Sequence, residues 1–296
     1  MRLKNKLVFT SIIVLFLVKF CFAFEWKALH EEADKTNLAQ ALEGVQNNPN
    51  SYAAQYILGL VYLNLHQDKE AGEVFDRLVS LETGRSEARW GKAEVLRRQH
   101  KLDESEKILR EVIKGDPNFS PAYVTLAYLR YTKLDFKEAM RLAVKVINQG
   151  RDNVDLTNFS RGYLIYAGTK GMIAHFGGPF AKAFNGPSVL PNIKKAERLK
   201  PNTPGVLFGL GSFYFLAPRI IGGDLGKAES CLKKAIEVDP LFTDAYVRLA
   251  QVYQHKGNKE LYEKYLSKAL EIDPGNEMAL DIKSGRCKFI CVANQE

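Results

Sequence analysis

Histidine, cysteine, methionine and tryptophan are scarce in this sequence. Its 296 residues include 5 histidines, 4 cysteines, 4 methionines and 2 tryptophans. It contains no His-Glu-x-x-His, Gly-x-x-x-x-Gly-Lys or Gly-x-Ser-x-Gly segment, the patterns of zinc hydrolases, P-loop proteins and serine hydrolases. We therefore expect no enzymatic activity, no catalytic residues, no cofactor and no metal site.

The chain also lacks a strongly apolar run of membrane-spanning length near its N-terminus. The run Leu7–Val18 has 12 residues, whereas a spanning helix needs about 20. Basic residues precede this run, and Cys21-Phe22-Ala23 after it resembles a small-x-Ala cleavage site. The pattern predicts a signal peptide over residues 1–23 and a periplasmic or secreted protein. The alternative is an uncleaved single-pass anchor, so we expect membrane contact only through that segment or through partners.

Neither a large net charge nor a dense set of cysteines is present. The formal charge is +8, and half of it lies in residues 1–23. The remainder is too small to indicate nucleic-acid binding. Export would expose the later cysteines to an oxidising compartment. Cys231 lies on a predicted helix as a buried thiol, whereas Cys287 and Cys291 could close a small loop if their segment is not helical.

The sequence is rich in self-similarity. The 34 residues that begin at Ser86 are followed by 34 residues of the same pattern that begin at Ser120. The frame extends back to Tyr52, and Pro240 and Pro274 repeat it further along the chain. A fixed period of this length is typical of stacked helical repeats. His66 and His100 occupy equivalent positions between two predicted helices, which indicates a structural role for both.

Small residues occupy the eighth and twentieth positions of these repeats, and Asp-Pro pairs stand where the second helices should end, because proline cannot continue a helix. This pattern resembles the tetratricopeptide repeat family. The resemblance implies an all-α superhelical solenoid, with two irregular central repeats that carry inserted loops. The expected layout is a capping helix at 24–51, three regular repeats at 52–153, two irregular repeats at 154–242, a final repeat at 243–276 and a tail at 277–296.

The two irregular repeats are longer than the others, and their surplus falls in segments rich in glycine and proline. The first surplus lies within residues 175–191 and the second within 217–224, each between the two helices of its repeat. We expect the two insertions to touch, with Asp224 as a helix N-cap. They are either longer turns that cover exposed apolar surface, or a lid or docking knob. The insert residues concerned are Phe180, Phe184, Arg219, Ile220 and Ile221.

The segment "PRIIGGD" before a regular repeat also resembles the periplasmic T-component proteins of tripartite ATP-independent (TRAP) transporters. That resemblance covers about Phe208–Pro274. It implies a helical-repeat protein that docks a solute-binding protein and passes ligand through a cavity. A small ligand is therefore expected under this alternative only.

The family resemblance also implies a binding groove lined by first-helix positions 2, 5, 9, 12 and 13. Those positions hold Tyr56, Asn64, Trp90, Glu94, Arg97, Arg98, Val124, Tyr128, Tyr131, Gln251, Gln254 and His255. The family's carboxylate clamp is absent, since Trp90 and Glu94 replace its lysine and asparagine. Aromatic and arginine side chains favour a protein or peptide partner. The competing interpretation places Trp90 and one tyrosine in the core between repeats.

Together these features predict an exported interaction scaffold or adaptor of the cell envelope. The alternative is a TRAP-type transporter accessory. The sequence does not specify the partner or the oligomeric state.

Overall fold

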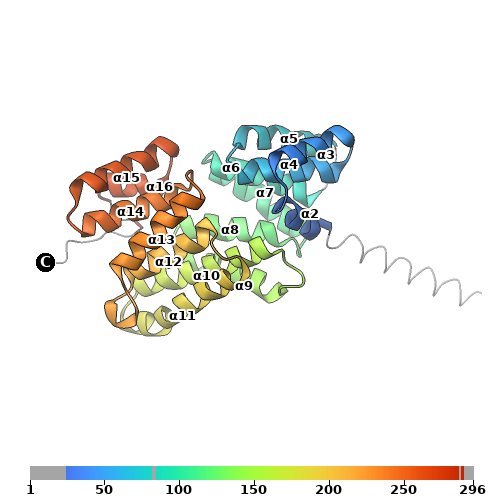
Figure 1. Cartoon of the computed structure of the whole chain (residues 1–296). Helices are drawn as coiled ribbons and strands as arrows, with labels where there is room; N and C mark the ends of the chain where they lie inside the picture. Colours follow the sequence, from blue (N-terminus) through green and yellow to red (C-terminus); the bar gives the residue numbers. More distant parts are fainter. Residues whose placement is uncertain (1–24, 82–84, 287, 290–296) are drawn as a thin grey trace, which may run out of the picture. The chain divides into compact units, whose positions relative to one another are not determined.

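The structure is a computed structural model that describes residues 25–81, 85–286 and 288–289 (Figure 1). The predicted signal peptide lies outside the described residues. Cys287 and the tail from residue 290, which includes Cys291, lie outside them as well. The described part is all-α and contains no strand. It divides into two compact units, of which unit 1 comprises residues up to Ala122 together with Gln149–Asp155, and unit 2 comprises Tyr123–Asn148 and the chain from Leu156.

The helices of unit 1 come first in the chain. They are α2 (Glu25–Ala33), α3 (Leu38–Asn47), α4 (Tyr52–Asn64), α5 (Asp68–Leu81), α6 (Ser86–Arg98) and α7 (Leu102–Gly115). Helix α4 packs on α5, and α6 packs on α5 and α7. The boundary between the units passes through α8 (Ser120–Thr132).

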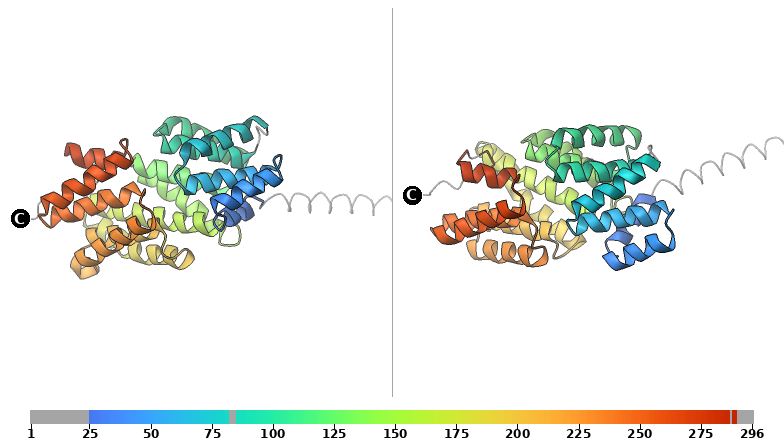
Figure 2. Two further views of the ribbon diagram at one scale, coloured as in Figure 1. Left: turned by 45° about the horizontal axis from the view of Figure 1, so that its top comes forward. Right: turned by 90° about the horizontal axis from the view of Figure 1, so that it is seen from above.

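The remaining helices belong to unit 2. They are α9 (Phe136–Gln149), α10 (Leu156–Phe176), α11 (Pro179–Leu199), α12 (Pro204–Leu216), the 3₁₀ helix η1 (Arg219–Ile221), α13 (Leu225–Val238), α14 (Thr243–His255), α15 (Lys259–Ile272) and α16 (Glu277–Ser284). Helices α10 and α11, α12 and α13, and α14 and α15 pack as successive pairs (Figures 1 and 2).

Small residues allow the paired helices to approach closely, as the repeat pattern predicts. In unit 1, the fully buried Ser105 hydroxyl donates to the Ala93 carbonyl oxygen at 2.7 Å. A Cβ at Gly59 would lie 2.8 Å from Cζ of Phe75, and a Cβ at Gly91 would lie 2.3 Å from Cδ1 of the same ring. Phe75 is fully buried, so its ring fills the space that the two glycines leave.

The turns between paired helices also repeat. His66, His100 and Leu134 have φ of 58°, 60° and 61°, and Gly257 has φ of 71° at the equivalent position. In each turn the next residue donates its N–H to the carbonyl five residues earlier, as from Lys101 to Leu96 at 2.9 Å. This is the hydrogen bonding of a helix that ends in a left-handed residue. The turn explains the spacing of the two histidines.

The Asp-Pro pairs end the second helices, as the sequence predicts. Asp116, Asp239 and Asp273 are the C-caps of α7, α13 and α15, and each has extended backbone angles. The starts of the second helices differ from one another. The Asp135 carboxylate accepts from the Glu138 N–H at 3.2 Å at the start of α9. Helix α7 begins at Leu102, so Asp103 lies in its first turn and is not its N-cap.

Two sequence expectations differ from the structure. Residues 24–51 were expected to form one capping helix, but the chain forms α2 and α3, because Asn37 and Gln40 make a capping box that begins a second helix. The first insertion was expected to be a loop. Instead only Gly177 and Gly178 separate α10 from α11, and α11 continues through Pro187 and Pro191. The first insertion is therefore a helical hairpin, and the expectation of an inserted loop there was wrong.

The second insertion is a tight joint between α12 and α13. The Asp224 carboxylate accepts from Gly226 and Lys227 N–H at 2.9 and 3.0 Å, so it is the predicted N-cap. Gly222 has φ of 107°, and a Cβ at Gly223 would lie 1.8 Å from the Ala217 carbonyl oxygen. Both glycines are therefore needed for the chain path itself.

Candidate partner-binding surface

The predicted groove residues Tyr56 and Trp90 occupy the same position of two successive first helices in unit 1. Both are buried, with 0% and 4% exposed. Helix α2 covers them: its Trp26, Leu29, His30 and Ala33 are also buried. These four follow the i, i+3, i+4, i+7 spacing of one helix face. The surface predicted to be the groove of unit 1 is therefore covered by a helix of its own chain.

The contact is aromatic with one polar bond at its centre. His30 Nε2 and the Tyr56 hydroxyl lie 2.8 Å apart. The His30 ring lies 5.1 Å from Trp90 and 5.9 Å from Trp26, and Phe119 lies 5.3 Å from Trp26. Burial, followed by nearby negative groups including Glu87, raises the pKa of Tyr56 well above its usual value. The hydroxyl thus stays protonated and can donate to an unprotonated Nε2.

The groove's polar residues in unit 1 form ion pairs with one another. Glu94 is 3% exposed, and its carboxylate accepts from Arg97 at 2.7 Å and lies 3.6 Å from Nε of Arg98. Arg98 also donates to Asp68 at 2.9 Å and to the Leu63 carbonyl oxygen at 2.8 Å. Asn64 is exposed. Both arginines therefore compensate a buried carboxylate, which ties the first helix of one repeat to the repeat before it.

In unit 2 the predicted groove residues differ in exposure. Tyr128 and Tyr131 are half-buried, Val124 and Gln251 are buried, and Gln254 and His255 are exposed. The Tyr131 ring lies 6.0 Å from Phe136, and burial raises the pKa of Tyr131.

Arg248 of α14, which sequence reasoning missed, is 5% exposed. It donates to Gln251 Oε1 at 2.6 Å and lies over the Phe208 ring at 5.9 Å. Burial lowers the pKa of Arg248. This guanidinium and Gln251 connect three helices of unit 2, since Met278 Sδ of α16 also lies 3.7 Å from it.

The insert residues are among the most exposed apolar side chains described. Ile220 is 94% exposed, Phe180 81%, Phe184 77% and Ile221 49%. Arg219 is exposed as well. Sequence reasoning found these residues but assigned Phe180 and Phe184 to a loop, whereas they lie on the first turns of α11.

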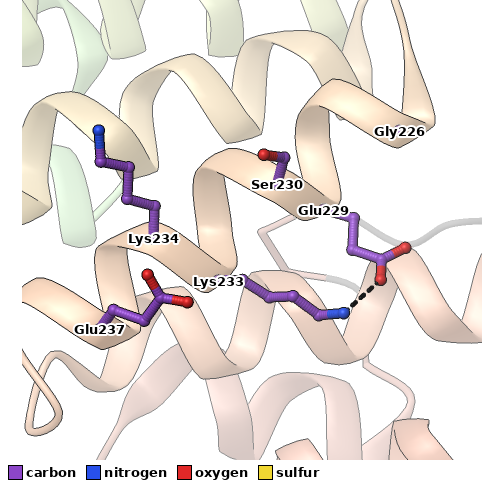
Figure 3. A pocket seen from close by; sticks show the side chains of 6 residues that line it. All are labelled: Gly226, Glu229, Ser230, Lys233, Lys234 and Glu237. Atoms are coloured by element: carbon purple, nitrogen blue, oxygen red, sulfur yellow. Dashed lines mark hydrogen bonds and ion pairs between the residues drawn. The ribbon is translucent and has the colours of Figure 1, made fainter.

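A surface depression on α13 contains an ion pair (Figure 3). Its lining residues are Gly226, Glu229, Ser230, Lys233, Lys234 and Glu237. Glu229 and Lys233 point toward one another and lie 2.6 Å apart, and Glu229 also accepts from Tyr253 at 2.8 Å and from Lys256. The hydrogen bond from Lys233, with a smaller contribution from that of Lys256, lowers the pKa of Glu229 to about 2. Glu229 and Lys233 are therefore paired, whereas Lys234 donates to Asn202 Oδ1 at 2.8 Å.

The part of the chain that the structure describes has neither a metal-ligand cluster nor a membrane-spanning helix. No group of three metal-ligating side chains occurs there. No helix of that part is long and apolar enough to span a bilayer. Cys231 is half-buried with a free thiol, and burial raises its pKa. It is therefore a poor nucleophile at neutral pH.

Comparison with known sequences identifies one repeat directly. Residues 243–276 match the family model described as tetratricopeptide repeat. No curated protein matches the chain.

Solved structures with the same fold are more numerous. The chain is similar to the APC/C hetero-tetramer Cut9-Hcn1 at 17% identity and a TM-score of 0.55, covering 89% of this chain and 48% of that one. It is similar to a tetratricopeptide repeat protein from Parabacteroides merdae at 15% identity and a TM-score of 0.52, covering 88% and 98%. The human IFIT1 dimer with m7Gppp-AAAA gives 17% identity and a TM-score of 0.55, covering 79% and 55%.

The chain spans about half the length of the Cut9-Hcn1 and IFIT1 chains. At these identities the likeness concerns the fold alone. Residues 243–276 are a tetratricopeptide repeat, and the all-α fold of this protein is that of the tetratricopeptide-repeat helical solenoids.

Proposed function

We propose that this chain is an exported scaffold or adaptor that binds a helical segment of a partner protein on the first-helix face of unit 1. The observation that carries the proposal is the position of α2. Its buried face meets the two residues, Tyr56 and Trp90, that the family resemblance assigned to the groove. A surface that accepts one amphipathic helix has the shape and chemistry to accept another.

The position of α2 also defines the chemistry of the expected ligand. A partner helix would carry an aromatic residue and, one turn later, a side chain that hydrogen-bonds the Tyr56 hydroxyl, as Trp26 and His30 do. The partner helix would have to displace α2, and Trp26 and His30 would then lose their burial. Displacement of α2 therefore requires a partner that makes the same contacts, and this requirement favours specific partners.

A peptide experiment tests the groove. The variant Trp26→Ala with His30→Ala weakens the internal ligand, so a labelled peptide of residues 25–35 should bind it more tightly than it binds the unmodified protein. The control peptide with alanine in place of Trp26 and His30 should not bind. Fluorescence anisotropy measures both. If the variant keeps its helical circular dichroism and binds neither peptide, the groove is not a helix-binding site.

The cellular part of the proposal needs a separate measurement. Crosslinking capture of the tagged protein from its native envelope fraction, followed by mass spectrometry, identifies the partner. Assembly or secretion components that are lost in the Trp90→Ala variant would support the adaptor. A solute-binding protein or transporter subunit would instead support the transporter accessory. Recovery of the protein only from the cytoplasm would refute export.

A further inference from the structure

We propose that the end of the α10–α11 hairpin docks on an anionic lipid surface. Both helices have 21 residues, whereas their neighbours α9 and α12 have 14 and 13. At 1.5 Å per residue the hairpin is about 10 Å longer than the adjacent helices. The two helices pack along each other (Figure 1). Only Gly177 and Gly178 separate them in the chain.

Three phenylalanines gather at this end. Phe176 closes α10 with 52% of its surface exposed, and Phe180 and Phe184 lie one turn apart on α11 at 81% and 77%. Phe176 stacks on the half-buried Phe136 at 6.2 Å. Residues one turn apart face the same side of a helix, so Phe180 and Phe184 share a face. Exposed apolar side chains that are concentrated at one end of a hairpin indicate an interaction site more strongly than singly scattered ones do.

The charge of the surrounding segment identifies the occupant. From Leu156 to Gly223 the sequence contains a single acidic residue, Glu197, which pairs with Lys194 at 2.8 Å. The same segment contains eight basic residues: Arg161, Lys170, Lys182, Lys194, Lys195, Arg198, Lys200 and Arg219. Eight basic residues and one acidic residue give this segment a net charge of +7, carried by α10, α11, Lys200 and the joint that follows α12.

Two of these basic residues accompany the exposed apolar side chains. Lys182 lies between Phe180 and Phe184 in the chain and is exposed. Its backbone N–H donates to the Gly178 carbonyl oxygen at 3.1 Å, so Lys182 lies at the turn between α10 and α11. Arg219 precedes Ile220, which is 94% exposed. Phenylalanine and isoleucine beside lysine and arginine are the composition of segments that lie in the interface of anionic membranes.

A lipid surface fits these side chains better than a nucleic acid does. Ile220 and Ile221 offer no flat ring for base stacking, and the exposed rings lie on the end of a hairpin. Single-stranded nucleic acid is bound instead by aromatic residues along a basic groove. An acidic protein would match the charge but would need its own apolar hollow for three phenylalanines.

Vesicle binding tests the proposal. The protein without residues 1–23 keeps every described residue and removes the apolar run Leu7–Val18, which would partition into lipid by itself. It should sediment with vesicles of phosphatidylcholine and phosphatidylglycerol, and this binding should weaken as salt rises. Vesicles of phosphatidylcholine alone should bind at least about tenfold less.

A matched pair of variants assigns the binding to the hairpin. Phe180→Glu with Phe184→Glu should reduce partitioning into the anionic vesicles at least about tenfold. The control Leu65→Glu with Leu241→Glu makes the same charge change at leucines 46% and 45% exposed elsewhere, and should bind nearly as well as the unmodified protein. Equal losses in both variants, or no loss in the first, would overturn the proposal.

A fluorescence variant answers the question without disrupting the surface. Trp26 and Trp90 are both buried in unit 1, so Phe184→Trp adds the one tryptophan at the hairpin end. Its emission should move to shorter wavelength on anionic vesicles. The proposal would be overturned if the emission did not shift and the protein did not bind vesicles. Binding to single-stranded RNA, or self-association, that depends on Phe184 would then identify RNA or a second copy of this chain as the partner of this surface.

Discussion

The substitution Gly91→Ala in α6 sets helix propensity against packing. Alanine in a helix interior is favoured over glycine by about 1 kcal/mol. However, a Cβ at Gly91 would lie 2.3 Å from Cδ1 and Cε1 of Phe75, whereas carbon atoms in contact are about 3.5 Å apart or more. The ring would have to retreat by more than about 1 Å. Gly59 and Tyr56 already contact it from other sides, so it has no free space.

We therefore expect Gly91→Ala to destabilise the protein. Overpacking a core costs about 1–3 kcal/mol, of which the helix propensity of alanine offsets up to about 1 kcal/mol. Urea unfolding followed by far-ultraviolet circular dichroism measures the net change. The control is Gly44→Ala in α3, where a Cβ would have no atom within 4 Å. That variant should be more stable than the unmodified protein by up to about 1 kcal/mol.

A double substitution tests the cause. Phe75→Leu removes part of the ring that alanine at position 91 would strike, so it should cost less in the Gly91→Ala background than alone. We expect the two changes to couple by about 1 kcal/mol or more. The reasoning is refuted if Gly91→Ala is as stable as the unmodified protein while Gly44→Ala stabilises, or if Phe75→Leu and Gly91→Ala are additive.

Three further predictions concern the joint, the ion pairs of α13 and the contact of α2. Gly223→Ala should lower the melting temperature far more than Gly257→Ala, because a Cβ at Gly223 would lie 1.8 Å from the Ala217 carbonyl oxygen. A Cβ at Gly257 would meet no atom within 4 Å, so that variant costs only the left-handed strain of about 1–2 kcal/mol. Equal effects of the two substitutions would contradict this reasoning. The pKa of Glu229 is lowered from 4.5 to about 2, so its ionised carboxylate stabilises the fold fully above pH 4.5, and this stabilisation is lost as the pH falls toward 2. Glu229→Gln should therefore cost about 1 kcal/mol at neutral pH, a small amount because Lys233 is 46% exposed and solvent screens the pair. The difference in urea midpoint between the variant and the unmodified protein should vanish near pH 2. His30→Ala leaves the buried Tyr56 hydroxyl without its partner at 2.8 Å and should cost about 1–3 kcal/mol, with a red shift of tryptophan emission, because both tryptophans lie beside His30.

Features encoded locally or periodically could be predicted from the sequence. The Asp-Pro helix ends, the Asp224 cap and the small residues between paired helices depend on neighbouring residues or on the repeat period. The hairpin α10–α11 could not be predicted this way. Its glycines and prolines indicate a loop. However, Val189 and Leu190 pack against a buried cluster that α10, α11 and α12 share, and tertiary packing of this kind overrides local propensity.

The candidate site was predicted less completely. The repeat frame located Tyr56 and Trp90 correctly within their helices, but what covers them lies outside the frame. Asn37 and Gln40 have the spacing of a capping box, and that signal would have separated α2 from α3. The apolar spacing of Trp26, Leu29, His30 and Ala33 would then have identified a short helix in need of a partner surface.

The aromatic contact of α2 has a consequence for how the protein folds. Solenoids generally fold by adding one repeat to the next, since each repeat contacts only its neighbours. Here Trp26, at the beginning of unit 1, packs on Phe119, near its end. Such a pairing closes a long loop of chain and raises contact order, which slows folding. During synthesis α2 emerges first but waits for its docking surface, so unit 1 should complete its fold only after α7 has formed.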